Sequence, residues 1–179
     1  DTFSSQDAAY CCHDINDDYK ALESFAEEFV SKKLEEYNAY LERHDEVFST
    51  EQLEEAMQKV MDQYAGGIAT DYQYNEERLV IGEKRIGELL GMVDELKAKD
   101  MFELKDIYEV RERLIVCQTL IEHLRARKET RWHSFAENLD HPQKSDDWKK
   151  YVNTKKVDGK IKVILRELVK EDEHYEKTV

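Results

Sequence analysis

Proline and glycine are scarce in this chain: its 179 residues include one Pro and six Gly. An all-β fold needs many tight turns, in which these two residue types are favoured, so their scarcity argues against such a fold and favours helices. Charged residues make up 38% and hydrophobic residues 40% of the chain, a composition typical of soluble globular proteins. A chain of this length can bury roughly two thirds of its unfolded surface, so one domain with a real core is expected.

Cysteine is also rare, and long hydrophobic runs are missing. Cys11 and Cys12 are adjacent and Cys117 lies inside a helical pattern, which does not make a disulfide framework. A zinc site that includes His13 is disfavoured, because zinc needs four spaced ligands and no second Cys pair follows. No apolar run approaches the roughly 20 residues that a membrane-spanning helix needs. We therefore expect no metal, no direct membrane insertion and a reducing, cytoplasmic setting, with any signal peptide absent or already removed.

Basic residues are outnumbered, and the net charge is -14 at pH 7. Nucleic-acid binding is driven by Lys and Arg side chains that meet phosphates, and no basic patch interleaved with aromatic residues is present. Residues 149–179 carry nine Lys and Arg against six Asp and Glu, so residues 1–148 hold a net charge of -17. This pattern indicates a solvated acidic surface and no nucleic-acid partner.

Hydrophobic residues recur at three- and four-residue steps over about residues 17–44, which predicts a helix with one apolar face. We expect that face to belong to the core. Its members are Leu22, Phe25, Ala26, Phe29, Val30, Leu34, Tyr37, Tyr40 and Leu41.

Two capping patterns mark the starts of further helices. Ser49 followed by Gln52 is a capping box, which predicts a helix from about Thr50. Asp100, followed three residues later by an acidic residue, predicts the start of a long helix that continues to about residue 125.

Between these helices, Gly66 and Gly67 should mark a kink, a break or a close backbone approach. Gly87 and Gly91 lie one turn apart on one face, which would permit close helix–helix or helix–domain approach, and we expect tight packing there. Residues 17–130 are thus predicted to form an all-α, up-down-up three-helix bundle, spectrin-repeat-like, after an irregular segment at residues 1–16.

After Thr130 the helical periodicity disappears. Pro142 favours extended chain over helix around it. Asp158-Gly159, flanked by alternating apolar residues, predicts a short β-hairpin near residues 157–165. Residues 131–179 are therefore predicted to be a mostly irregular tail that carries this hairpin.

Several motifs occur together in one order. They are Met61-Asp62-Gln63-Tyr64-Ala65-Gly66-Gly67, Glu129-Thr130-Arg131-Trp132, Asn138-Leu139-Asp140-His141-Pro142, Asp146-Asp147-Trp148 and Tyr151-Val152-Asn153. Their order and spacing resemble the C-terminal helical domain of the fumarate reductase and succinate dehydrogenase flavoprotein family. Within that family they are most similar to the adenylylsulfate reductase α subunit and its fumarate-reductase-like relatives. The resemblance spans about residues 50–166.

The resemblance implies one part of an electron-transport oxidoreductase. Family members hold FAD in an N-terminal flavin-binding domain, and no glycine-rich dinucleotide motif or βαβ alternation is found here. We therefore expect no catalytic, cofactor-binding or metal-binding residue in this chain, and FAD in the parent flavoprotein. The expected partners are the flavin-binding domain of the same parent protein and, as a further candidate, an iron–sulfur subunit.

The motif residues are then expected to serve interdomain docking. This set comprises Tyr64, Gly66, Gly67, Glu129, Arg131, Trp132, Asp140 and Trp148. Arg131 beside Glu129 is expected to form an ion pair that fixes where the tail leaves the bundle, and Asp140 is expected to form a turn or cap. An exposed apolar patch around Gly66, Gly67 and Trp132 would be the docking surface. The alternative is a stand-alone helical interaction module with no flavin partner.

Overall fold

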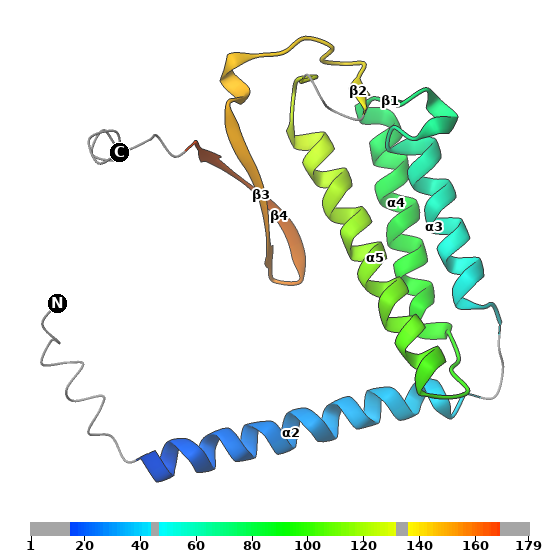
Figure 1. The fold of residues 1–179 in the computed structure, drawn as a ribbon, viewed down its shortest axis with the longest axis vertical. Coiled ribbons are helices and arrows are strands. Elements are labelled where there is room, and N and C mark those ends of the chain that lie inside the picture. The colour runs from blue at the N-terminus through cyan, green and yellow to red at the C-terminus, as the bar shows by residue number, and fades with distance from the viewer. Residues whose placement is uncertain (1–14, 44–46, 132–135, 169–179) are drawn as a thin grey trace, which may run out of the picture.

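The computed structural model describes residues 15–43, 47–131 and 136–168 (Figure 1). It confirms a mostly helical chain with a small antiparallel hairpin near the C-terminus. The main elements are α2 (Ile15–Leu41), α3 (Thr50–Tyr64), α4 (Glu76–Met92), α5 (Met101–Ala126), β3 (Lys150–Val157) and β4 (Lys160–Glu167). The short elements are η1 (Ile68–Thr70), β1 (Gln73–Tyr74), η2 (Val93–Glu95), β2 (Glu137–Asn138) and η3 (Asp146–Trp148).

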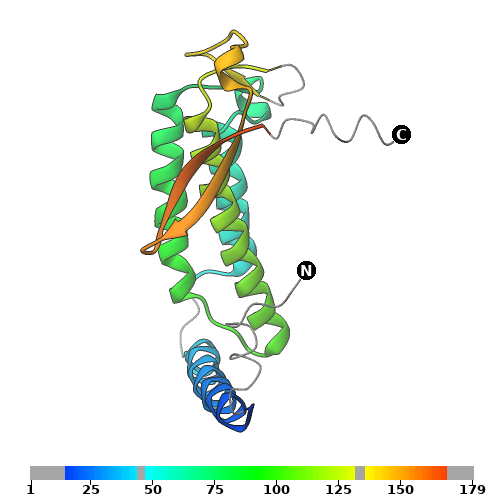
Figure 2. The ribbon, with the colours of Figure 1, turned by 90° about the vertical axis from the view of Figure 1, so that its left-hand side faces the viewer.

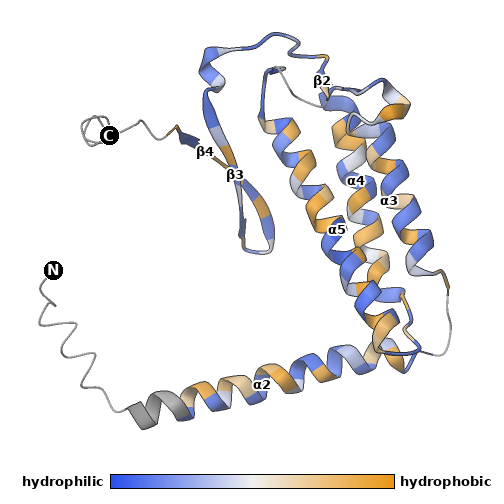
Figure 3. Cartoon of the chain, in the orientation of Figure 1, coloured by the Kyte–Doolittle hydropathy of each residue, from blue (hydrophilic) through white to orange (hydrophobic). Residues whose placement is uncertain are grey.

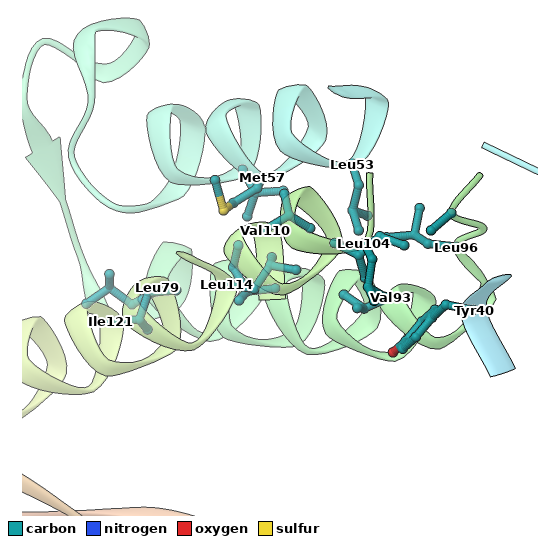
Figure 4. Close-up of a cluster of buried hydrophobic side chains, with 14 of the residues drawn as sticks. Tyr40, Leu53, Met57, Leu79, Val93, Leu96, Leu104, Val110, Leu114 and Ile121 are labelled. Carbon is teal, nitrogen blue, oxygen red and sulfur yellow. The ribbon is translucent and has the colours of Figure 1, made fainter. Parts of the chain in front are cut away.

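Three helices, α3, α4 and α5, lie side by side and run up, down and up in Figure 1. Their facing side chains form the core, which is drawn in Figure 4. Buried members include Leu53 and Met57 from α3, Ile86 from α4, and Leu114 and Ile121 from α5. The up-down-up bundle is thus made of different helices from those predicted, because the double glycine separates α3 from α4.

Helix α2 projects from one end of this bundle (Figures 1 and 2). The prediction that its whole apolar face belongs to the core is wrong. Only its last turns pack on the bundle, where Tyr40 is buried and Tyr37 and Leu41 are partly buried. Between residues 20 and 36 the apolar side chains of α2 are exposed. Figure 3 shows hydrophobic positions as orange bands along this helix.

Both predicted helix starts are confirmed. The Ser49 side chain accepts a hydrogen bond from the Gln52 backbone N–H, and the Gln52 side chain accepts from the Ser49 backbone N–H. Asp100 Oδ1 accepts from the backbone N–H groups of Phe102 and Glu103 at 2.8 and 3.0 Å. Each cap satisfies backbone donors that the first turn leaves without a helical partner.

The hairpin is longer than predicted, with β3 and β4 paired from Lys150–Glu167 to Val157–Lys160. Asp158 and Gly159 form its turn with φ angles of +51° and +76°. The hairpin contacts α5 and lies beside it (Figures 1 and 2), and alternate residues from Lys150 to Thr154 of β3 are partly buried. This contact stabilises a two-stranded ribbon that would be marginal alone.

Gly87 does not support close packing, because a Cβ atom built there meets nothing within 4 Å, and the same holds for Gly91. The close approach is instead at Gly82, whose Cβ would lie 3.0 Å from the Tyr64 Cβ. The prediction of tight packing at Gly87 and Gly91 is therefore wrong for this chain.

The open space at Gly87 and the close contact at Gly82 can be tested by chemical denaturation. Gly87→Ala is expected to raise the free energy of unfolding by about 0.5–1 kcal/mol, because Ala reduces the entropy lost on forming a helix. Gly82→Ala is the matched control and should show no such gain, since Tyr64 would have to move. An equal gain at both positions would contradict the packing described here.

Candidate docking site at the junction of bundle and tail

The junction is built around a buried carboxylate. Glu129 is 1% exposed. Its Oε1 accepts from Arg127 Nη1 and from Arg131 Nε, each at 2.7 Å, and its Oε2 accepts from Arg131 Nη2 and from the Ser145 N–H, each at 3.0 Å. We call these four residues the Glu129 cluster. A buried charge is tolerated only when it is paired and hydrogen-bonded, and here every lone-pair direction has a donor.

Electrostatics keep this carboxylate ionised. Burial by itself would raise the pKa of Glu129, but the hydrogen bonds from Arg131, from the Ser145 backbone and from Arg127 outweigh it. The pKa of Glu129 therefore lies below its ordinary value of 4.5. The predicted Glu129–Arg131 ion pair is confirmed by its 2.7 Å contact.

Arg127 connects the end of α5 to the start of the hairpin. Its Nη1 donates to the Trp148 carbonyl at 3.0 Å, and its Nη2 donates to the Lys150 carbonyl at 3.1 Å. Its guanidinium carbon lies 5.9 Å from the centre of the Trp148 ring, within the range of a cation–π contact. Sequence reasoning missed Arg127, since a basic residue after a helix is usually explained by the helix dipole.

Asn138 is the second residue that sequence reasoning missed. It is 5% exposed and lies in β2, which pairs in parallel with β1. Its Nδ2 donates to the Arg127 carbonyl at 3.3 Å, and its Oδ1 accepts from the Asp140 N–H at 3.0 Å. Its backbone N–H donates to the Thr130 hydroxyl at 2.9 Å. Asn138 therefore ties the tail to both the end of α5 and the loop before α4.

Asp140 is confirmed as a capping residue. Its Oδ2 accepts from the Glu76 N–H at 2.7 Å, at the first residue of α4. A carboxylate at a helix N-terminus satisfies a free donor and interacts favourably with the helix dipole. Asp146 and Asp147 begin η3, where the Ser145 hydroxyl accepts from the Asp147 N–H at 3.2 Å.

The glycine pair lies where α3 meets the tail. Gly66 has φ +81°, and a Cβ there would lie 2.6 Å from the Ala136 Cβ. A Cβ on Gly67 would collide with the Asp62 side chain and backbone. Tyr64 packs against Gly82, and the Arg85 guanidinium lies 5.4 Å from its ring centre. The glycine pair thus follows the end of α3 and allows Ala136 of the tail to come close to the backbone. A break and a close backbone approach were both among the predicted outcomes.

The structure therefore brings together most of the predicted docking residues at one end of the bundle. Glu129, Arg131 and Trp148 share the Glu129 cluster and its contacts, and Gly66 meets Ala136 of the tail. Trp132 lies outside the described residues. Near Gly67, exposed apolar side chains are present at Ile68, 73% exposed, and at Tyr72, 50% exposed. We call Ile68 and Tyr72 the junction patch.

The polar side chains at this end of the bundle hold the tail and the helices together. The acids and bases of the Glu129 cluster are engaged with one another or with backbone groups. No group of three His, Cys, Asp or Glu side chains that would suit a metal is found in the described ranges. Cys11, Cys12 and His13 lie outside those ranges. Among the helices that the structure describes, none is both long enough and apolar enough to cross a membrane.

Comparison with known proteins shows which structures this chain resembles. No protein-family model matches the chain, and no curated protein matches it. Several solved structures do match it. Adenylylsulfate reductase of the hyperthermophile Archaeoglobus fulgidus is 27% identical with a TM-score of 0.70, and the match covers 83% of this chain and 25% of that chain. Adenosine-5-phosphosulfate reductase in complex with sulfite, as a covalent adduct, is 29% identical with a TM-score of 0.69 and the same coverage.

A third structure, the E. coli quinol fumarate reductase chain, is 16% identical with a TM-score of 0.63, over 79% of this chain and 24% of that chain. That identity shows the shared fold alone. This chain spans about a quarter of the length of the structures that it matches. The resemblance expected from the motifs is thus confirmed: the chain has the fold of the C-terminal helical domain of the fumarate reductase and succinate dehydrogenase flavoprotein family, with adenylylsulfate reductase and fumarate reductase chains as structural neighbours.

Proposed function

We propose that this chain is the C-terminal helical domain of an FAD-dependent oxidoreductase of the fumarate reductase, succinate dehydrogenase or adenylylsulfate reductase type. The main support for this proposal is the structural match to two reductase chains, which are 27% and 29% identical. Each match covers 83% of this chain and 25% of the reductase chain. In this proposal the chain has no catalytic centre of its own, and FAD is held by the flavin-binding domain of the parent protein.

The role proposed for the chain is docking. The Glu129 cluster holds the tail against the bundle and so shapes the junction, with Glu129 buried and the Arg127 and Arg131 side chains 29% and 33% exposed. The junction patch is the outward-facing apolar part of the same end. Exposed apolar side chains next to a rigid scaffold are typical of an interface. We therefore propose that the flavin-binding domain contacts Ile68 and Tyr72, and that an iron–sulfur subunit is a further partner in cytoplasmic electron transport.

The spectrum of the full native gene product tests the parent activity. A flavin absorption band together with reductase activity is the expected result, because the structural neighbours of the chain are flavoproteins. A native protein that ends at the limits of this sequence and binds no flavin would establish the alternative, a stand-alone helical interaction module.

The junction patch is tested in that same full-length protein with Ile68→Asp. The fold should survive, since Ile68 is 73% exposed, while hydrogen exchange at residues 66–74 should become about tenfold faster as docking weakens. Val116→Asp on α5 is the matched control, because Val116 is 64% exposed and lies on α5, outside the junction. Unchanged exchange at the junction, or an equal effect of the control, would count against docking through this patch.

A further inference from the structure

Five large apolar side chains project from α2 into solvent. They are 52–66% exposed and are Leu22, Phe25, Phe29, Val30 and Leu34, which we call the α2 stripe. Their three- and four-residue spacing places them on one side of the helix. The rings of Phe25 and Phe29 also stack on each other, with centroids 6.4 Å apart. The stripe is therefore a contiguous apolar surface along about 18 Å of helix, at 1.5 Å per residue.

The same side of α2 packs on the bundle further along the chain. Tyr37 and Tyr40 both contact the Tyr108 ring of α5, with centroid distances of 5.4 and 6.2 Å. Tyr40 is the one residue of α2 among the buried hydrophobic residues of the described ranges. The core is filled by side chains of α3, α4, α5 and the segments that connect them, together with Tyr40 (Figure 4). The α2 stripe is thus surplus to the core of this bundle.

The direction of α2 is fixed by a polar cluster at its base. Arg111 Nη1 lies 3.2 Å from Glu36 Oε1, and Arg111 Nη2 donates to the Tyr40 hydroxyl at 2.8 Å. Tyr108 donates to Glu36 at 2.7 Å, and Asp94 accepts from both Arg111 and Tyr40. Such a network holds the last turns of α2 against α5 and η2. The helix that carries the stripe is therefore held in a set direction and extends away from the bundle (Figures 1 and 2).

We propose that the α2 stripe packs on the flavin-binding domain of the parent protein, as a docking surface separate from the junction patch. This inference rests on the proposed function. In the matched structures the shared fold is about a quarter of a longer chain, so most of each neighbour lies outside it. Contiguous apolar patches of more than a few hundred Å² are rare on free monomers and mark interfaces. Domain interfaces within one chain bury about 600–1,500 Å², a range that a five-residue stripe suits.

Charge favours this occupant over a second copy of the chain. Helix α2 contains seven Asp and Glu against three Lys, so two paired α2 helices would bring two net charges of -4 together. A face with apolar residues at its centre and Lys or Arg at its rim would complement the stripe and the acids beside it. The proposal thus specifies the chemistry of the facing surface: apolar with a basic rim.

Site-specific photo-cross-linking in the full native gene product tests this contact. Benzoylphenylalanine in place of Phe25 or Phe29 should cross-link to peptides of the flavin-binding domain, at least about tenfold more than at Ser24, which lies on the other side of α2. Cross-links confined to a second copy, or no excess over Ser24, would overturn the proposal. The absence of flavin from the native protein would instead contradict the proposed function. Failure of the stripe contact and failure of the proposed function are therefore distinguishable.

A double variant gives an independent readout in the same full-length protein. Phe25→Glu with Phe29→Glu should accelerate backbone hydrogen exchange over residues 22–34 by about tenfold or more, because a covered helix face becomes exposed. Ser24→Glu also adds an acid at an exposed position of α2, but Ser24 lies three or four residues from no member of the stripe, so this variant should leave exchange unchanged. Equal exchange in the parent and the double variant would show that nothing covers the stripe.

Discussion

Replacing Glu129 with Gln is expected to lower the free energy of unfolding by about 2–4 kcal/mol, measured by chemical denaturation at pH 7. The amide nitrogen that replaces one carboxylate oxygen is a donor, and it would face donors from Arg131 and Ser145 or from Arg127 and Arg131. Two guanidinium groups would also lose their counter-charge. They are about 30% exposed, so solvent screens part of this loss and the effect falls below that of a fully buried pair.

Glu137→Gln is the control for this variant. Glu137 is an exposed carboxylate at the same end of the bundle, and it accepts one hydrogen bond, 3.1 Å long, from Gln73 Nε2. Its replacement should change the free energy of unfolding by no more than about 0.5 kcal/mol. Equal effects of the two substitutions would show that the Glu129 cluster does not stabilise the junction.

The same carboxylate predicts how stability depends on pH. The pKa of Glu129 is lowered in the folded protein, so the unfolded chain takes up the proton first as pH falls. The stabilisation by Glu129 is therefore complete above its ordinary pKa of 4.5 and is lost as pH falls through the folded value. The difference in unfolding free energy between the parent chain and Glu129→Gln should shrink over this acidic window. A constant difference from pH 6 to pH 3 would rule out this linkage.

Local features of the fold were predictable from sequence because they depend on few neighbouring residues. The Ser49 and Asp100 caps, the hairpin turn at Asp158 and the Glu129–Arg131 ion pair each need residues within three positions of one another. The periodicity of α2 also predicted a helix with an apolar face. A periodic pattern shows that one face of a helix is apolar, but it does not show what covers that face. For this reason the prediction that Leu22 to Leu34 belong to the core was wrong.

Long-range contacts were not predictable, because no local spacing encodes them. Asn138 is buried through contacts with Arg127 and Thr130, eight or more residues away in a segment without periodicity. The hairpin is longer than expected because α5 supports β3 and β4 beyond the turn that sequence reasoning recognised. The double glycine predicted a break or a close approach, and only the fold identified Ala136 as the approaching residue.

Gly66→Ala is expected to cost about 2–4 kcal/mol, since it adds the strain of a left-handed backbone to that of overpacking. A Cβ at Gly66 would lie 2.6 Å from the Ala136 Cβ and 3.2 Å from the Tyr74 ring. Gly159→Ala separates the two causes, because Gly159 has a similar φ of +76° but its Cβ would meet nothing within 4 Å. That control should lose only about 1–2 kcal/mol in chemical denaturation. If both variants lose the same amount, the contact of α3 with the tail contributes nothing, and the closed junction on which the proposed docking surface depends would have to be abandoned.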